Sequence, residues 1–112
     1  MTGAEQSGPR DTLALELRRG ALVLAVLSRL RYEQYGYSLK KSLTEAGLEI
    51  DEGTLYPLLR RLESQGLLRS RWRVEDGRPR RYYRINAQGE AVLRALADDW
   101  RELAQALGRL LK

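Results

Sequence analysis

The apolar positions of this chain repeat with a helical period up to about residue 65, with the period of a strand up to residue 85, and helically again to the end. The first helix is predicted over residues 12–30. Its segment 21–27 is apolar on nearly all sides, which favours a helix at the centre of a domain, and Gly20 can separate a short leading helix from it. Its apolar positions are Leu13, Leu17, Leu22, Leu24, Val26, Leu27 and Leu30.

A second helix is predicted over residues 37–46, after a polar loop at 31–34. Leu39 and Leu43 lie one turn apart on its inner face, and Gly47 follows in the position of a C-terminal cap.

A third helix is predicted from Asp51, an N-cap residue, to about Gln65, where Gly66 closes it. Pro57 lies further into this helix than is ideal, so a start nearer Thr54 is the alternative. Its inward positions are Leu55, Leu58, Leu59 and Leu62.

Two strands with alternating polarity follow, over residues 67–74 and 80–85. Between them, residues 75–79 predict a five-residue turn that contains the hairpin signal Asp76-Gly77. One face of the first strand is apolar (Leu68, Trp72, Val74) and the other carries Arg69, Arg71 and Arg73; the second strand sets Arg81, Tyr83 and Ile85 against Arg80, Tyr82 and Arg84. We expect Trp72, Tyr83 and Ile85 to lie in the core.

A last helix, capped by Asn86, is predicted to reach about Leu111, a length of roughly 37 Å. Its apolar residues are spaced by three and four positions, which is a heptad pattern. The preceding residues are too few to cover this stripe, so a second copy of the chain is expected to cover it; the alternative is a helix folded back on its own domain. The expected dimer contacts are Leu93, Leu96, Trp100, Leu103, Leu107 and Leu110.

Composition limits the classes of function. A chain of 112 residues fits one compact domain, here 12–85, with residues 1–11 expected to be a disordered lead-in and 86–112 a C-terminal helix. The chain has no Cys and no His, so thiolate sites, the commonest metal ligand and the commonest general base are absent. No enzyme activity, metal or cofactor is expected. No apolar run approaches the roughly 20 residues that span a bilayer, and a cytoplasmic protein is expected.

Positive charge is concentrated in one segment. The net charge is +5, and residues 60–84 contain nine Arg against three acidic residues. Such a patch attracts a polyanion, of which DNA is the usual one, although an ordinary solvated face is the alternative for an Arg-rich stretch taken alone.

Three helices followed by a hairpin make a winged helix-turn-helix, and three blocks make the resemblance specific. Residues 35–39 (YGYSL), 53–68 (GTLYPLLRRLESQGLL) and 77–85 (GRPRRYYRI) resemble signature blocks of the PadR family of bacterial regulators, and the similarity extends from about Arg18 to the C-terminus. The single last helix resembles the short-tailed branch of that family.

The resemblance implies a mainly α fold with a two-stranded β-hairpin: a winged helix-turn-helix plus a long C-terminal dimerisation helix. It also implies a homodimeric repressor on a palindromic operator in the bacterial nucleoid. In some short-tailed members, an apolar pocket between the subunits takes flat hydrophobic compounds.

Candidate DNA contacts come from three segments. The N-terminal half of the third helix would enter the major groove, the start of the second would cross the backbone, and the turn would present guanidinium groups to phosphate or to the minor groove. Instead of contacting DNA, Lys40 could be solvated and Tyr56 could be a core tyrosine; these are the alternatives at the two positions. The candidates are Tyr37, Lys40, Thr54, Tyr56, Arg60, Arg61, Arg78 and Arg80.

A planar hydrophobic effector is the last expectation. Trp100 lies in the middle of the heptad stripe, and two indoles could sandwich a flat molecule, with space left by Ala97 and Ala104. Plain interface packing is the alternative. The competing function is a winged helix that docks an acidic protein; a carboxylate-dependent enzyme is disfavoured because no acidic pair has a suitable spacing.

Overall fold

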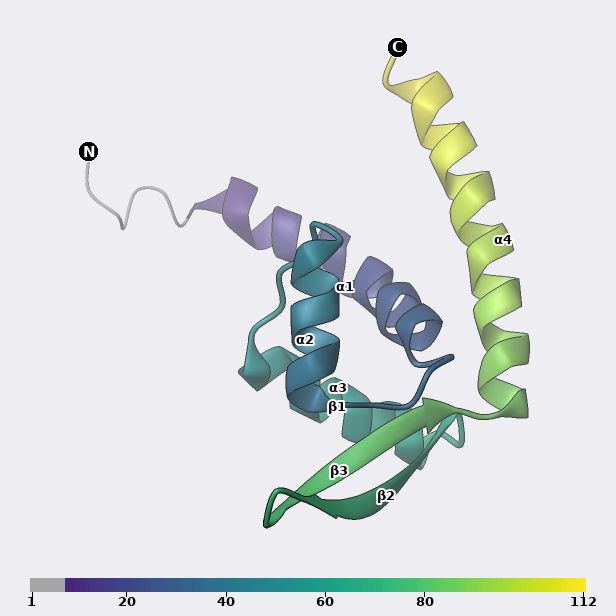
Figure 1. The fold of residues 1–112 in the computed structure, drawn as a ribbon. Coiled ribbons are helices and arrows are strands. Elements are labelled where there is room, and N and C mark those ends of the chain that lie inside the picture. Colours follow the sequence, from purple (N-terminus) through teal and green to yellow (C-terminus); the bar gives the residue numbers. More distant parts are fainter. Residues whose placement is uncertain (1–7) are drawn as a thin grey trace.

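The computed structural model describes residues 8–112, which form four helices and a small sheet at one end of the helical part (Figure 1). The sheet is antiparallel with the order β1-β3-β2. The elements in chain order are α1 (Pro9–Arg29), β1 (Gln34–Tyr35), α2 (Gly36–Glu45), α3 (Glu52–Ser64), β2 (Leu68–Glu75), β3 (Arg78–Ile85) and α4 (Ala87–Leu110).

The helix ends follow the capping residues in the sequence. The side chain of Asp51 accepts a hydrogen bond from the Thr54 N–H at 2.8 Å, and that of Asn86 accepts one from the Gly89 N–H at 2.8 Å. Gly47 has a positive φ of 92° after the end of α2, a conformation that glycine adopts at little cost. The start of α3 at Asp51, rather than nearer Thr54, and the start of α4 are therefore confirmed.

The core lies where the C-terminal half of α1 meets α2, α3 and one face of the sheet. All of its buried residues are apolar or tyrosine; side chains less than 2% exposed include Leu27, Leu39, Leu55, Leu59 and Leu62. At roughly 1.5–3 kcal/mol for each fully buried side chain of this kind, their burial is the main stabilising contribution.

The N-terminal half of α1 differs from the expectation. The helix is continuous through Gly20, and Leu13 and Leu17 are exposed instead of joining the core. The reason is geometric: the first turns of α1 project beyond α2 and α3, and the contact of this half that lies nearest the core is a hydrogen bond from Arg18 to the carbonyl of Glu49 at 2.8 Å (Figure 1). Of the expected disordered segment 1–11, residues 9–11 lie in α1, and residues 1–7 fall outside the described part.

The sheet also differs in two details. Gln34, expected in a loop, and its neighbour Tyr35 pair with β3 as a third strand. The turn has two residues and not five, because Asp76 and Gly77 both have positive φ (54° and 74°), as a type I′ hairpin requires, and Glu75 pairs directly with Arg78. This two-residue turn and the strands β2 and β3 are called the wing below.

Burial within the wing corrects the assignment of Trp72 to the core. Tyr83 and Ile85 are in the core as expected, but Trp72 is 65% exposed and Val74 is also exposed. Both are on the face that packs on α3, yet they lie nearer the turn, beyond the part of the face that is buried. Tyr82, on the opposite face, is buried because Tyr35 of β1 packs edge-on against its ring.

The helix α4 begins against its own domain and then leaves it (Figure 1). Leu93, expected at a dimer interface, is instead 4% exposed in the core of its own chain, so the folded-back alternative holds for the first turns of the helix. The later apolar positions are exposed: Trp100, Leu103, Leu107 and Leu110. Within residues 8–112, no helix is both long and apolar enough to cross a membrane.

Candidate nucleic-acid interface

The exposed N-terminal end of α3 brings two candidate residues, Thr54 and Lys40, together around Asp51. Hydrogen bonds from Thr54, first from its side chain and then from its backbone, hold the pKa of Asp51 below its ordinary value, and the charge of Lys40 lowers it further. Lys40 on α2 is therefore close to the start of α3. The carboxylate of Asp51 already occupies part of this helix end, and Glu52 adds a second negative charge, so Lys40 is the group beside this turn that would attract a DNA phosphate.

Tyr56 joins α3 to the start of α2. Its ring is half-buried against the core and lies directly on Gly36, where a Cβ atom would overlap the ring. The ring of Tyr56 therefore packs against the core, as the alternative for this residue expected. Its hydroxyl group is the part that remains a candidate for contact with DNA. The contact of the ring with Gly36 also explains why the residue before Tyr37 is glycine.

Arg60 and Arg61 are adjacent on α3 and so point in different directions. The pKa of the buried Tyr83 hydroxyl in the wing is raised, mainly because of burial. The charge of Arg81, and to a smaller extent that of Arg60, acts in the opposite direction, so Arg60 lies near this hydroxyl. Arg61 instead lines a hollow of about 310 Å³ between α1 and α3, together with Thr54 and Arg19. Sequence reasoning missed Arg19, because nothing in its neighbourhood along the chain marks it.

The two candidate arginines of the wing lie in different surroundings. Arg78 is exposed beside the turn, whereas Arg80 is half-buried with its guanidinium 4.5 Å from the ring centroid of Tyr35. Tyr35 in turn stacks on Tyr37 at 6.5 Å. This aromatic contact joins the wing to the start of α2, so that Tyr37, Arg80 and the wing lie on one connected surface.

Three wing arginines form ion pairs with carboxylates. Arg71 and Arg73 bind Glu33 at 2.8 and 2.9 Å, and Arg81 binds Glu63 at 2.9 Å. Hydrogen bonds and charge from Arg71, and then from Arg73, lower the pKa of Glu33. Within residues 8–112, the arginines of segment 60–84 without a carboxylate within 4.0 Å are Arg60, Arg61, Arg69, Arg78, Arg80 and Arg84.

The candidate effector residues lie on the part of α4 that leaves the domain. Trp100 is 55% exposed, Ala97 is half-buried and Ala104 is exposed, and the three lie on adjoining parts of one side of the helix. In a single chain they form a surface and not an enclosed pocket. No group of three His, Cys, Asp or Glu side chains that could hold a metal ion occurs in the described part of the chain.

Residues 23–95 match the model of the transcriptional regulator PadR-like family. This chain belongs to the PadR family. The match covers α2, α3 and the wing, which are the elements that carry all eight candidate DNA contacts.

Relatives of this PadR-family chain agree in sequence and in structure. It is 41% identical over 97 residues to the transcriptional regulator Rv3488 of Mycobacterium tuberculosis, a match that covers 86% of this chain and 88% of that protein. The crystal structure of a PadR family transcriptional regulator from Eggerthella lenta is 51% identical, covers 91% of each chain and has a TM-score of 0.85. A transcriptional regulator from Clostridium thermocellum is 29% identical, covers 87% of this chain and 99% of that one, and has a TM-score of 0.80.

The PadR-family chain is therefore a DNA-binding transcriptional regulator with a winged-helix fold, and not an enzyme. This assignment favours DNA, rather than an acidic protein, as the partner of the basic surface.

Proposed function

We propose that this regulator is a repressor that acts as a homodimer on a palindromic operator, within the bacterial nucleoid. The N-terminal end of α3 enters the major groove, and the wing reaches the adjacent phosphates or minor groove. The observation that carries the proposal is the selective lack of carboxylate partners: Arg60, Arg78 and Arg80 have none within residues 8–112, while Arg71, Arg73 and Arg81 are paired. The proposed DNA contacts are Tyr37, Lys40, Thr54, Tyr56, Arg60, Arg61, Arg78 and Arg80.

The exposed stripe of α4 supports the homodimer. Large apolar side chains cover the outer half of this helix, and a contiguous patch of that kind marks an interface in a soluble protein. A two-fold dimer repeats the α3 and wing contacts on a second half-site, which is why we propose a palindromic operator. The proposed contacts are Leu96, Trp100, Leu103, Leu107 and Leu110; Leu93 is removed from the expected set because its own chain covers it.

Replacing Arg78 with alanine tests the DNA surface. Six to eight phosphate contacts in a dimer give a slope of log K against log salt of about −0.9 per contact. The substitution removes one contact from each subunit, so we expect the slope to flatten by about 1.8, with weaker binding on all sequences alike. Fluorescence anisotropy with labelled operator and random duplexes, from 50 to 300 mM salt, measures both quantities.

Two further variants separate charge from base recognition. Arg109→Ala removes the same charge near the far end of α4 and should leave the slope unchanged. Thr54→Val, at the exposed start of α3, should change the preference for operator over random DNA while the slope stays the same. A slope that Arg78→Ala leaves intact would contradict the assignment of the wing.

We further propose that a planar hydrophobic effector binds between the two α4 helices at Trp100, with Ala97 and Ala104 beside it. The support is an indole that is 55% exposed in the middle of the proposed interface. In a Trp72→Phe variant, which leaves Trp100 as the chain's single tryptophan, flat aromatic compounds should quench its fluorescence and weaken operator binding together. Quenching without a change in operator affinity, or no response to any compound class, would argue against an effector site.

A further inference from the structure

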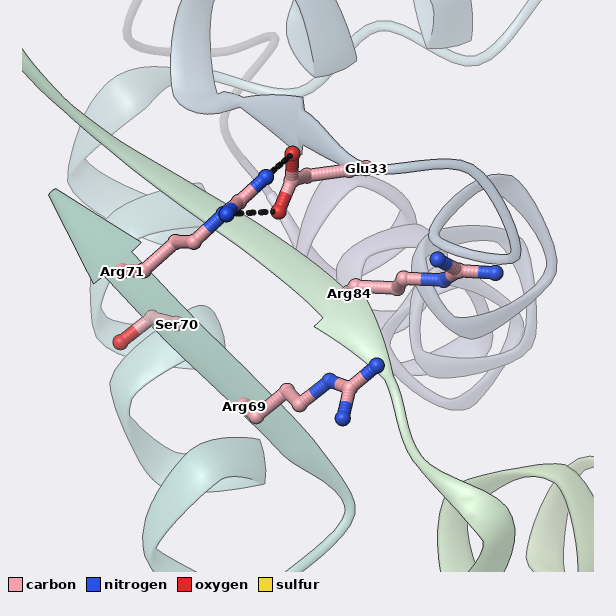
Figure 2. Close-up of a pocket in the computed structure, with 5 residues that line it drawn as sticks. All are labelled: Glu33, Arg69, Ser70, Arg71 and Arg84. Atoms are coloured by element: carbon pink, nitrogen blue, oxygen red, sulfur yellow. Dashed lines mark hydrogen bonds and ion pairs between the residues drawn. The ribbon is translucent and has the colours of Figure 1, made fainter. Parts of the chain in front are cut away.

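A hollow of about 430 Å³ lies on the face of the wing opposite α3, and no part of the proposed DNA surface uses it. It is lined by Glu33, Arg69, Ser70, Arg71 and Arg84 (Figure 2). The side chain of Ser70 points away from it and binds Glu63 of α3 on the other face of the sheet. The walls of the hollow are therefore mostly guanidinium groups.

Two of these arginines face each other without compensation. Arg69 of β2 and Arg84 of β3 are direct partners in the strand register, which places their Cβ atoms roughly 5 Å apart. Both side chains are exposed, and within residues 8–112 neither has a carboxylate within 4.0 Å. Like charges in directly opposite positions destabilise a pair of strands, so an anion bound between them would remove an existing repulsion.

The third guanidinium is held in position. Arg71 donates from Nε and Nη2 to the two carboxylate oxygens of Glu33, at 2.8 and 3.0 Å, which leaves its Nη1 outside this pair. Glu33 also accepts a hydrogen bond from Arg73 at 2.9 Å, so its single charge is already shared. The three arginines that line the hollow, set against this one carboxylate, leave two positive charges.

The position of the hollow separates it from the wing tip. Arg69 lies six residues before Glu75 on β2, which is roughly 20 Å along the strand from the turn where Arg78 lies. Arg84, which lines the hollow, is the residue before the last of β3, so the hollow lies at the base of the wing. This end of β3 leads into α4 (Figure 1).

We propose that Arg69, Arg84 and Arg71 bind a phosphate group, either as free phosphate or as part of a small molecule. A phosphate group brings close to two negative charges and at least three acceptor oxygens, which match the two uncompensated charges and the several free N–H donors of the hollow. A single carboxylate brings one charge and two oxygens in a plane, and it would leave one guanidinium unpaired. The planar forks of arginine bind phosphate oxygens in pairs, which a solvated lysine does not do.

Calorimetric titration of the full chain in the absence of DNA tests this site. The probes are inorganic phosphate and glycerol 3-phosphate, with potassium chloride keeping the ionic strength constant. We expect one site per chain, and at least tenfold weaker binding in Arg69→Gln and in Arg84→Gln. Arg109→Gln, which makes the same change near the end of α4, should bind as the unmodified chain does. The tighter of the two probes shows whether the site is filled by free phosphate or by a phosphate ester.

The variants also have a stability readout. Arg69→Gln and Arg84→Gln each remove one of two like charges, so both variants should melt at or above the temperature of the unmodified chain in phosphate-free buffer. Phosphate should raise the melting temperatures of the unmodified chain and of Arg109→Gln, but not those of Arg69→Gln and Arg84→Gln. Binding heat that equals the chloride control, or that both variants retain, would overturn the proposal. So would a flattening of the DNA salt slope in Arg69→Gln like that expected for Arg78→Ala, because these guanidinium groups would then contact DNA phosphates. The site does not depend on operator binding, so either proposal can fail alone.

Discussion

Replacing Leu103 with glutamate should convert the proposed homodimer to a monomer and weaken operator binding by about a hundredfold or more. Leu103 is 60% exposed in the middle of the stripe on α4, and a glutamate there would bring two carboxylates into an apolar interface. Two linked half-site contacts gain a factor of about 10² to 10⁴ over one, and a monomer loses this factor. Sedimentation equilibrium measures the oligomeric state, and anisotropy with a palindromic duplex measures the affinity.

Gln105→Glu is the matched control for this substitution. It adds the same negative charge two residues away, where the helical period places it on the opposite side of α4, and it should leave both the dimer and the affinity unchanged. A half-site duplex gives a second comparison, because the two variants should bind it with similar affinity. A dimer that persists in Leu103→Glu would show that this stripe is not the interface.

Replacing Gly89 with alanine should destabilise the fold by about 3 kcal/mol or more, near the upper end of the cost of overpacking a core. A Cβ atom there would overlap the carbonyl oxygen of Leu67 and lie 2.6 Å from Cγ1 of Ile85. The carbonyl belongs to the backbone, and it already accepts the N–H of Asn86 at 3.2 Å, so it has no room to move without breaking the joint at the base of α4.

Gly108→Ala on the same helix is the control, because no atom lies within 4 Å of a Cβ atom built there. Alanine is favoured over glycine inside a helix by about 1 kcal/mol, so this variant should be slightly more stable than the unmodified chain. Urea unfolding followed by far-UV circular dichroism measures both free energies of unfolding. Equal stability of the two variants would contradict the close contact of α4 with Leu67.

The local features of the fold could be predicted from the sequence because local residues determine them. Asp51 and Asn86 accept hydrogen bonds from N–H groups three residues later, as their types predicted. The hairpin signal Asp76-Gly77 correctly predicted the place of the turn, although the turn has two residues and not the expected five. The alternation of Tyr83 and Ile85 with polar residues likewise predicted their burial correctly.

Features that depend on where another element ends could not be predicted in this way. Trp72 continues the apolar alternation of Leu68, but the buried part of that face stops before it. In the same way, Leu17 continues the apolar face of α1 but is exposed, because α2 and α3 do not extend far enough to cover it. An apolar pattern predicts which face is turned inward, and only the lengths of the neighbouring elements decide how far that face is covered.

In the candidate DNA site, too, local features could be predicted from the sequence and contacts between distant segments could not. The sequence predicted a basic wing, but a count of charges within residues 60–84 gave no indication that Arg71 and Arg73 are paired with Glu33, which is 38 and 40 residues away along the chain. This partner became a neighbour only because β1 adds to the edge of β3. The uncompensated pair of Arg69 and Arg84 also depends on the strand register.

The joint between β3 and α4 has a consequence for the DNA that the regulator can select. One residue, Asn86, connects the two elements, and it also donates from its side chain to the carbonyl of Gly66 at 2.9 Å. In the proposed dimer, each winged-helix domain is therefore fixed to its α4 helix without a flexible linker. One extra base pair between the half-sites moves the second half-site by about 3.4 Å and turns it by about 34° around the duplex. The rigid connection between β3 and α4 does not allow the second domain to follow this change. Such a dimer would select operators by the spacing of their half-sites as strictly as by their base sequence.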